Sequence, residues 1–175
     1  MAAPLRLGIA GLGTVGVGVV RIVRKQAALL ARRTGRDIQI SAVSARDAAK
    51  DRGVSLTGYD WESDAVSLAQ RDDVDVFVEL IGGTDGPARD ATIAALSAGK
   101  DVVTANKALL AIHGQELAEL AEKTGGSIRF EAAVAGGIPV IKTMREALAG
   151  NEVNRVFGIM NGTANYILTR MEETG

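Results

Sequence analysis

The chain has 175 residues, of which 47% are hydrophobic and 23% are charged, a composition typical of a globular protein with one domain or slightly more. The net charge of −1 excludes the basic surface that nucleic-acid binding requires, and the absence of cysteine excludes disulfides, thiolate metal ligands and thiol nucleophiles. No apolar run approaches the ~20 residues of a membrane span, and no signal sequence precedes the first apolar run, so we expect a cytoplasmic protein without membrane or nucleic-acid partners.

Residues 5–16, LRLGIAGLGTVG, join an apolar run to a glycine-rich turn. The run is typical of a buried parallel strand, and the apolar residues that follow recur at helical spacing. A G-x-G-x-x-G sequence between a strand and a helix is the fingerprint of a dinucleotide-binding turn. We therefore predict that this turn binds the pyrophosphate of a dinucleotide cofactor with Gly11, Leu12, Gly13, Thr14, Val15 and Gly16.

Each glycine of the turn has its own predicted role. Gly11 permits the tight turn, Gly13 lets the backbone approach the pyrophosphate, and Gly16 lets the helix pack close to the strand. The unpaired amides at the helix start bind the anion, with ~0.3–1 kcal/mol of help from the helix dipole.

The pattern next predicts a helix over residues 14–33 and a second strand over residues 38–43. In a dinucleotide fold, the end of the second strand faces the adenosine ribose, where a carboxylate favours NAD and an arginine favours NADP. Here Arg46 and Asp47 follow each other, so the choice between NADP and NAD stays open. Arg46 is either the partner of a 2′-phosphate or a solvated surface residue.

A short helix is predicted over residues 59–70, with Ser63 as its N-cap and Trp61 as a packing residue. The strand predicted over residues 74–81 ends in a flexible Gly-Gly-Thr loop. Ligands bind at such carboxyl ends in open α/β sheets. We therefore expect this loop to contribute Ile81, Gly82 and Thr84 to a cofactor site.

The next helix is predicted to start at Asp85 or Gly86, with Pro87 in its first turn, and to stop at Gly99. A strand over residues 101–104 then delivers Asn106 and Lys107 to the same edge of the sheet.

The last third of the chain alternates in the same way. It is predicted to hold a helix over residues 109–123 that breaks near Gly114, with His113 in a structural role, and a strand over residues 127–133. A tight turn with free carbonyls (134–139), a helix (139–148), a strand (153–160) and a final helix capped by Thr163 follow. Strands that alternate with helices predict the α/β class, with a doubly wound parallel sheet of the Rossmann type.

Five segments resemble the homoserine dehydrogenases. They are GLGTVGVGVV from Gly11, VELIGG around Glu79, TANKALL from Thr104, EAAVAGGIPVI from Glu131 and IMNGTANYIL from Ile159. This resemblance implies oxidation of L-homoserine to L-aspartate 4-semialdehyde, and the reverse, with NAD or NADP in threonine and methionine biosynthesis.

The resemblance also implies roles for particular residues. Lys107 would position the substrate carboxylate and the nicotinamide ribose, as the catalytic residue that this chain supplies. A monovalent cation, usually sodium in the family, would be held by oxygens of Glu131, Val134, Gly136 and Ile138, and oxygen ligands suit such a hard cation. The loop that would line the substrate end of the cleft consists of Asn161, Gly162 and Thr163, with Ala164 where many members have a second threonine.

The domain division implied by the resemblance is an NAD(P)-binding domain over residues 1–135 and the start of an α+β substrate domain over residues 136–175. The family's substrate domain is longer, and it carries the acidic and lysine side chains that move the proton. We therefore expect an amino-terminal fragment, inactive alone, of a protein that is a homodimer at full length. Exposed apolar residues are expected on its last helix at Tyr166, Ile167, Leu168 and Met171.

Two alternatives remain. The chain is a cofactor-binding module without chemistry, or it belongs to another semialdehyde or sugar dehydrogenase with the same fold. The missing cysteine argues against the phosphorylating semialdehyde dehydrogenases, which need a thiol nucleophile.

Overall fold

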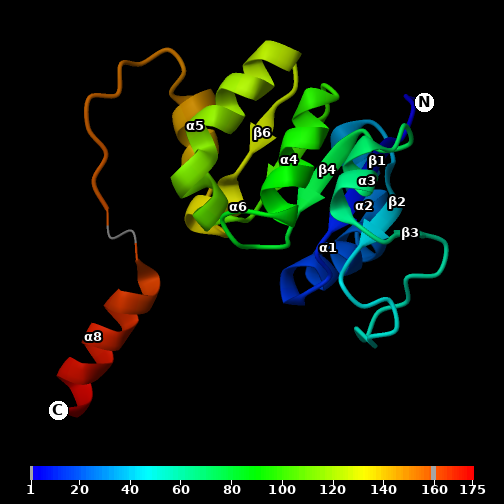
Figure 1. Ribbon diagram of the computed structural model, residues 1–175. Coiled ribbons are helices and arrows are strands. Elements are labelled where there is room, and N and C mark those ends of the chain that lie inside the picture. Colours follow the sequence, from blue (N-terminus) through cyan, green and yellow to red (C-terminus); the bar gives the residue numbers. More distant parts are fainter. Residues whose placement is uncertain (1, 159–160) are drawn as a thin grey trace.

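The computed structural model describes residues 2–158 and 161–175. Its centre is a six-stranded parallel sheet with the strand order β3-β2-β1-β4-β5-β6 (Figure 1). The strands are β1 (Leu5–Ala10), β2 (Ile38–Ser44), β3 (Asp60–Glu62), β4 (Val76–Glu79), β5 (Asp101–Thr104) and β6 (Ile128–Arg129). The predicted class, a doubly wound parallel sheet, is confirmed.

The helices connect the strands and continue after the sheet. They are α1 (Thr14–Lys25), α2 (Ala27–Thr34), α3 (Ala65–Gln70), α4 (Pro87–Ser97), α5 (Lys107–Thr124), α6 (Glu131–Ala135), α7 (Val140–Lys142), the π-helical turn η1 (Thr143–Ala147) and α8 (Gly162–Thr174). In the part of the chain that the structure describes, none of them combines the length and the apolar character that crossing a membrane requires.

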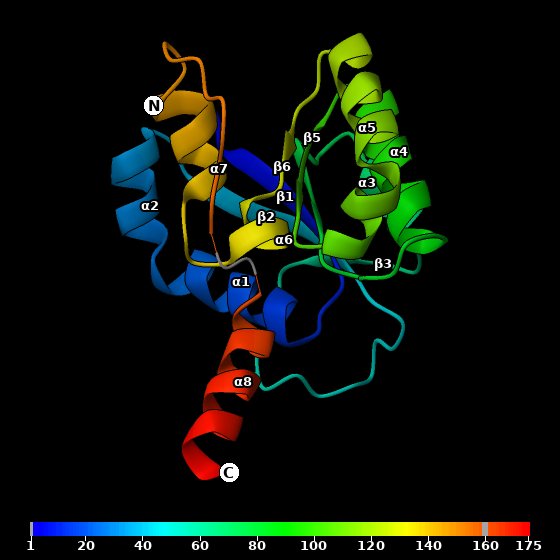
Figure 2. The same ribbon diagram turned by 90° about the vertical axis from the view of Figure 1, so that its left-hand side faces the viewer.

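Two apolar layers hold the sheet between its helices. Figure 2 shows α3, α4 and α5 on one face, and α1 and α2 on the other. Successive strand residues alternate between the faces, because side chains in a strand point to opposite sides. Phe77 joins the cluster under α3, α4 and α5, whereas its neighbours Val76 and Val78 join the cluster that contains Val20 of α1.

Two predicted helices differ from the structure in whether they are continuous. The helix predicted over residues 14–33 is two helices, because the backbone leaves helical geometry at Gln26, where φ is −105° and ψ is 13°. The second helix ends at Gly35, which has the left-handed conformation that suits glycine. In contrast, α5 runs through Gly114 without the predicted break, since its packing outweighs the weak helix propensity of one glycine.

The helix predicted over residues 59–70 is also wrong in its first half, because Asp60, Trp61 and Glu62 pair with β2 as strand β3. Asp64, rather than Ser63, caps α3 by accepting hydrogen bonds from the amides of Val66 and Ser67. Trp61 packs against the core of the α1 face, as predicted, and the guanidinium of Arg52 lies 5.5 Å from its ring centroid.

Differences also follow β5. The strand predicted over residues 127–133 is only two residues long, since Glu131 already begins α6. The strand predicted over residues 153–160 is absent from its described part, 153–158, where every residue is exposed and has no strand to pair with. Residues 159 and 160 lie outside the described residues. Finally, Asn161 rather than Thr163 caps α8, by accepting a hydrogen bond from the amide of Ala164 at 2.9 Å.

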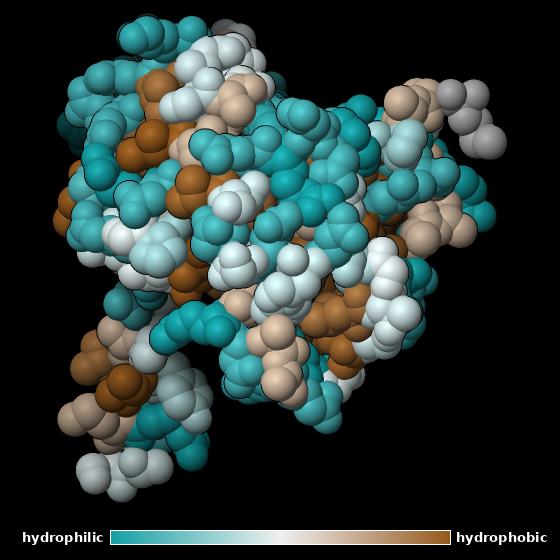
Figure 3. Space-filling model, turned by 45° about the vertical axis from the view of Figure 1, so that its right-hand side comes forward, coloured by the Kyte–Doolittle hydropathy of each residue, from teal (hydrophilic) through white to brown (hydrophobic). Residues whose placement is uncertain are grey.

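The last helix stands apart from the sheet. Figure 1 shows α8 at the end of an extended segment, and Figure 3 shows apolar atoms on its surface. The four apolar residues predicted to be exposed on this helix have exposed fractions between 50% and 65%. They are Tyr166, Ile167, Leu168 and Met171.

Candidate dinucleotide-binding site

The glycine-rich turn after β1 depends on contacts that only glycine permits. Gly11 has a φ of 95°, and a Cβ atom on it would lie 2.3 Å from the carbonyl oxygen of Leu80. A Cβ atom on Gly16 would lie 2.0 Å from the carbonyl oxygen of Gly11. Gly16 therefore lets α1 approach the turn directly after β1, which is the close packing that the sequence predicts.

Gly13 differs from both of these glycines. It precedes α1 with ordinary dihedral angles, φ −79° and ψ −163°, and a Cβ atom on it would meet nothing within 4 Å. The protein itself therefore does not require glycine at this position. Open space in front of the backbone is what a bound pyrophosphate needs, so this geometry fits the predicted role of Gly13.

The start of α1 is open to an anion. Among the residues that the structure describes, no side chain caps this helix, and the first turn of the helix contains no acidic residue. The N-termini of α3, α5 and α8, in contrast, are capped by Asp64, Asn106 and Asn161. The first amides of a helix have no partner within it and carry a partial positive charge. The N-terminus of α1, like that of α4, thus offers donors that α3, α5 and α8 give to their own capping side chains.

The end of β2 is joined to the glycine-rich turn, since the amide of Gly11 donates to the carbonyl oxygen of Ser44 at 2.8 Å. Arg46, two residues further, is exposed. The carboxylate of Asp47 accepts a hydrogen bond from the amide of Ala49 at 2.9 Å and so stabilises a local turn. Of the two residues that left the choice between NADP and NAD open, Asp47 thus forms a hydrogen bond within its own turn.

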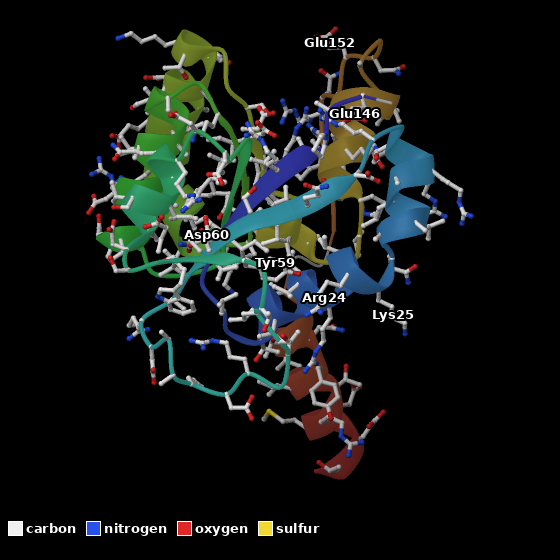
Figure 4. All side chains as sticks on the ribbon, turned by 90° about the vertical axis from the view of Figure 1, so that its right-hand side faces the viewer. Arg24, Lys25, Tyr59, Asp60, Glu146 and Glu152 are labelled. Carbon is white, nitrogen blue, oxygen red and sulfur yellow. The ribbon has the colours of Figure 1, made fainter. Side chains whose placement is uncertain are left out.

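The connection between β2 and β3 is held by arginines of α1. Arg21 donates to the carbonyl oxygen of Gly53 at 3.1 Å, and Arg24 donates to that of Ser55 at 2.6 Å. Figure 4 shows Arg24 on the side of α1 that faces this connection. These two charged side chains therefore have a structural role.

A buried carboxylate organises the neighbouring loops, and sequence reasoning assigned it no role. Glu79, the last residue of β4, is 0% exposed. Its Oε1 accepts hydrogen bonds from the amides of Ile81, at 2.8 Å, and Gly82, at 3.1 Å. Its Oε2 accepts a hydrogen bond of 2.5 Å from the hydroxyl of Thr104, the last residue of β5. The available signal was an acidic residue in an apolar strand, one position from the loop.

The side chains of Thr84 and His113 both contact the carboxylate of Asp85. Thr84 donates to Asp85 at 2.7 Å, and Nε2 of His113 lies 3.0 Å from the other oxygen of the same carboxylate. The hydrogen bonds from Thr84 and His113 hold the pKa of Asp85 below its ordinary value. His113 thus contacts a surface carboxylate, in line with the predicted structural role.

The strand order brings the predicted cofactor residues to one edge. Because β1 pairs with β4 and β4 pairs with β5, the glycine-rich turn, residues 81–84 and Lys107 follow adjacent strands. Backbone hydrogen bonds join them, from Leu80 to Ala10 at 2.7 Å and from Ala105 to Glu79 at 3.3 Å. Lys107 is exposed in the first turn of α5, with its side chain available to a ligand.

The residues predicted to hold a monovalent cation lie on α6 and in the connection to α7. The carboxylate of Glu131 accepts hydrogen bonds of 3.0 Å from the amides of Ile141 and Lys142, so it caps α7. The carbonyl oxygen of Ile138 accepts a hydrogen bond from Val140 at 2.8 Å. A cation here would share these oxygens with backbone amides and would use the carbonyls of Val134 and Gly136 besides.

The predicted substrate residues are not brought to this edge. Asn161, Gly162 and Thr163 form the exposed start of α8, and Figure 1 shows that helix away from the sheet. Their substrate role remains a prediction.

Comparison with known proteins finds similarity along the chain. Residues 11–131 match the family model "Homoserine dehydrogenase, NAD binding domain", and residues 139–175 match the model "Homoserine dehydrogenase". The chain is 48% identical over 172 residues to homoserine dehydrogenase of Neisseria gonorrhoeae, which covers 98% of this chain and 39% of that protein. The chain is 41% identical over 167 residues to homoserine dehydrogenase of Bacillus subtilis, and this match covers 95% of this chain and 38% of that protein. The chain therefore spans less than half of the length of these relatives.

Solved structures agree. A homoserine dehydrogenase from Thiobacillus denitrificans superposes with a TM-score of 0.89 and 40% identity, over 98% of this chain and 39% of that chain. A hyperthermophilic archaeal homoserine dehydrogenase in complex with NADPH shares the fold, with a TM-score of 0.79 and 23% identity, over 98% of this chain and 57% of that one.

Proposed function

Because the chain belongs to the homoserine dehydrogenase family, we propose that it binds NAD(P) and forms the cofactor half of an enzyme that interconverts L-homoserine and L-aspartate 4-semialdehyde. The observation that carries the proposal is the glycine-rich turn. It presents an uncapped helix N-terminus and an open backbone at Gly13, at the edge where the loops of β4 and β5 also end.

The division of labour follows from the residues. The turn from Gly11 to Gly16 holds the pyrophosphate, Arg46 meets the adenosine ribose or its phosphate, and Lys107 orients the substrate carboxylate at the nicotinamide end. Hydride transfer needs a positioned alcohol and a proton acceptor in addition to the cofactor. We assign binding and orientation to this chain, and proton transfer to the longer substrate domain of the family.

We propose the same domain boundary as the sequence analysis, with the cofactor domain over residues 1–135 and the substrate domain from residue 136. The match to the first family model ends at residue 131 and the match to the second begins at residue 139, which supports this boundary. A homodimer is the assembly that we propose for the whole protein, and sodium is the cation that we propose for Glu131, Val134, Gly136 and Ile138.

The experiment that tests the function uses the whole protein. Fluorescence titration measures the binding of NADPH and NADH, and absorbance follows the reduction of NADP⁺ or NAD⁺ when homoserine is added. We expect binding in the titration and turnover with homoserine but not with n-butanol, which lacks the amino and carboxyl groups. Cofactor binding without homoserine-dependent turnover would instead indicate a binding module.

A further inference from the structure

We propose that Glu79 is a positioning residue, which fixes the loops after β4 and β5 relative to each other and so places Lys107 beside the cofactor. This inference rests on the proposed function, since it concerns the same site. Its starting point is the burial of a carboxylate, at 0% exposure, among the apolar residues Val76, Phe77 and Val78 of the same strand.

The directions of the hydrogen bonds define what Glu79 does. The amides of Ile81 and Gly82 can only donate, and both donate to Oε1. The hydroxyl of Thr104 donates to Oε2 of Glu79, and its oxygen accepts from the amide of Asn106 at 2.9 Å. Glu79 therefore accepts three hydrogen bonds and donates none, which is the pattern of a carboxylate.

A second connection joins the same two loops. The side-chain amide of Asn106 donates to the carbonyl oxygen of Gly83 at 2.7 Å, and its oxygen accepts from the amide of Leu109 at 3.1 Å. The loop after β4 is thus attached to the start of α5 both through Glu79 and through Asn106. Lys107 follows Asn106 directly, so these bonds fix the position of its backbone relative to residues 81–83.

The network also sets what the loop after β4 can offer a ligand. The amides of Ile81 and Gly82 are already used by Glu79, so a further hydrogen bond from either backbone to a cofactor uses the carbonyl oxygen. Such oxygens accept from hydroxyl or amide groups and do not bind phosphate. Donors for phosphate remain at the start of α1, where no side chain caps the helix.

A purely structural role would not need a charge. An apolar side chain fills a sheet position without the desolvation that a buried carboxylate requires, and β4 uses apolar residues at its other three positions. The carboxylate is found at the last position of the strand, and from there it contacts both loops.

Thr104→Val tests the proposal, because it removes the hydroxyl at constant volume. Thr92→Val is the matched control, since Thr92 is also buried and its hydroxyl donates only within α4, to the carbonyl oxygen of Ala88 at 2.7 Å. Titration with NADPH and steady-state kinetics with homoserine are measured on the whole protein, together with the thermal unfolding midpoint. We expect Thr104→Val to lower kcat/KM for homoserine by about tenfold to a hundredfold, as misplacement of a reacting group does.

Thr104→Ser should restore kcat/KM, and Thr92→Val should leave it unchanged even if its unfolding midpoint falls. Glu79→Gln gives a second reading if Thr104→Val does not fold, because an amide nitrogen replaces one of the two accepting oxygens and cannot accept a hydrogen bond from Thr104 or from the loop amides. We expect it to lower kcat/KM in the same range. Variants with lower unfolding midpoints but wild-type kcat/KM would overturn the proposal. A wild-type protein that binds no NAD(P)H would overturn the proposed function instead, before any variant is compared.

Discussion

In the glycine-rich turn after β1, two glycines are required by the fold, and the third leaves space for a ligand. Gly11 and Gly16 face backbone oxygens of their own chain at distances that exclude a side chain. Gly13 faces open space in an extended conformation that any residue adopts. Substitution should therefore affect stability at the first two positions and binding at the third.

Gly13→Val should fold normally and lose the cofactor. Its isopropyl group would occupy the space in front of the backbone, at a cost of roughly 1–3 kcal/mol to the bound state, which corresponds to a rise in Kd of about fivefold to 150-fold. Fluorescence titration with NADPH and a thermal melt check both statements. Gly16→Ala is the counterpart and should lower the unfolding midpoint. Unchanged affinity in Gly13→Val would refute the assignment of the turn.

Arg46→Ala tests cofactor choice. If Arg46 binds the 2′-phosphate, its loss should weaken NADPH by roughly 1–3 kcal/mol, as for a hydrogen bond to a charged group, and leave NADH nearly unchanged. The two dissociation constants, measured by titration, are the readout. Arg33→Ala, an exposed arginine of α2, is the control and should change neither. Equal losses for both cofactors would show that Arg46 does not recognise the phosphate.

Sequence reasoning reached the site residues unevenly. The need for glycine at Gly11 and Gly16 could be predicted, because a motif and its flanking strand and helix are local features. The role of Glu79 could not, because it depends on Thr104, which lies 25 residues away and meets Glu79 only after β4 and β5 pair. Predicted cation and substrate residues remain predictions.

At the scale of elements, local patterns located helices better than their ends. The boundary at Gln26 and the short strand β6 are set by what each segment packs against. The cap of α3 shows the same effect, since Ser63 and Asp64 are both good N-cap residues by type. Only the position of the first helical residue decides between them.

Asp64→Ala should lower the free energy of unfolding by about 0.5–2 kcal/mol, the usual cost of losing an N-cap. The expected cause is the loss of its bonds to the amides of Val66 and Ser67. Ser63→Ala should have no such effect, which urea unfolding checks directly. Asn161→Ala removes an equivalent cap from α8, and it should leave the sheet domain unchanged because α8 is exposed throughout. A larger loss in Ser63→Ala than in Asp64→Ala would contradict the cap assignment.

We expect acid to destabilise the whole molecule. Hydrogen bonds from Arg71 and Arg6 lower the pKa of Asp73 and Asp75, and other partners lower those of Asp64, Asp85 and Glu116. A carboxyl whose pKa is lower in the folded state contributes stability that is present above its unfolded pKa, about 3.9 for aspartate. That stability is lost as the pH falls through the folded value.

Urea unfolding midpoints should therefore stay nearly constant from neutral pH to about pH 5 and fall steadily below about pH 4. Asp75→Asn should make the fall in the midpoint only slightly shallower, because the ion pair with Arg6 is about one-third exposed, at 37% and 35%. A midpoint that rises on acidification would contradict the assignment of these ion pairs.

The strand order has a consequence for synthesis on the ribosome. β1 leaves the ribosome first, yet it occupies the middle of the sheet and pairs with β4 as well as β2. Arg6 and Asp75, which join the starts of β1 and β4, are 69 residues apart. The nascent chain must therefore hold an unpaired edge of β1 until β4 has emerged, and unpaired edges favour aggregation. Chaperone contact with this chain should be strongest before residue 79 is exposed and should weaken once the central pair of strands has closed.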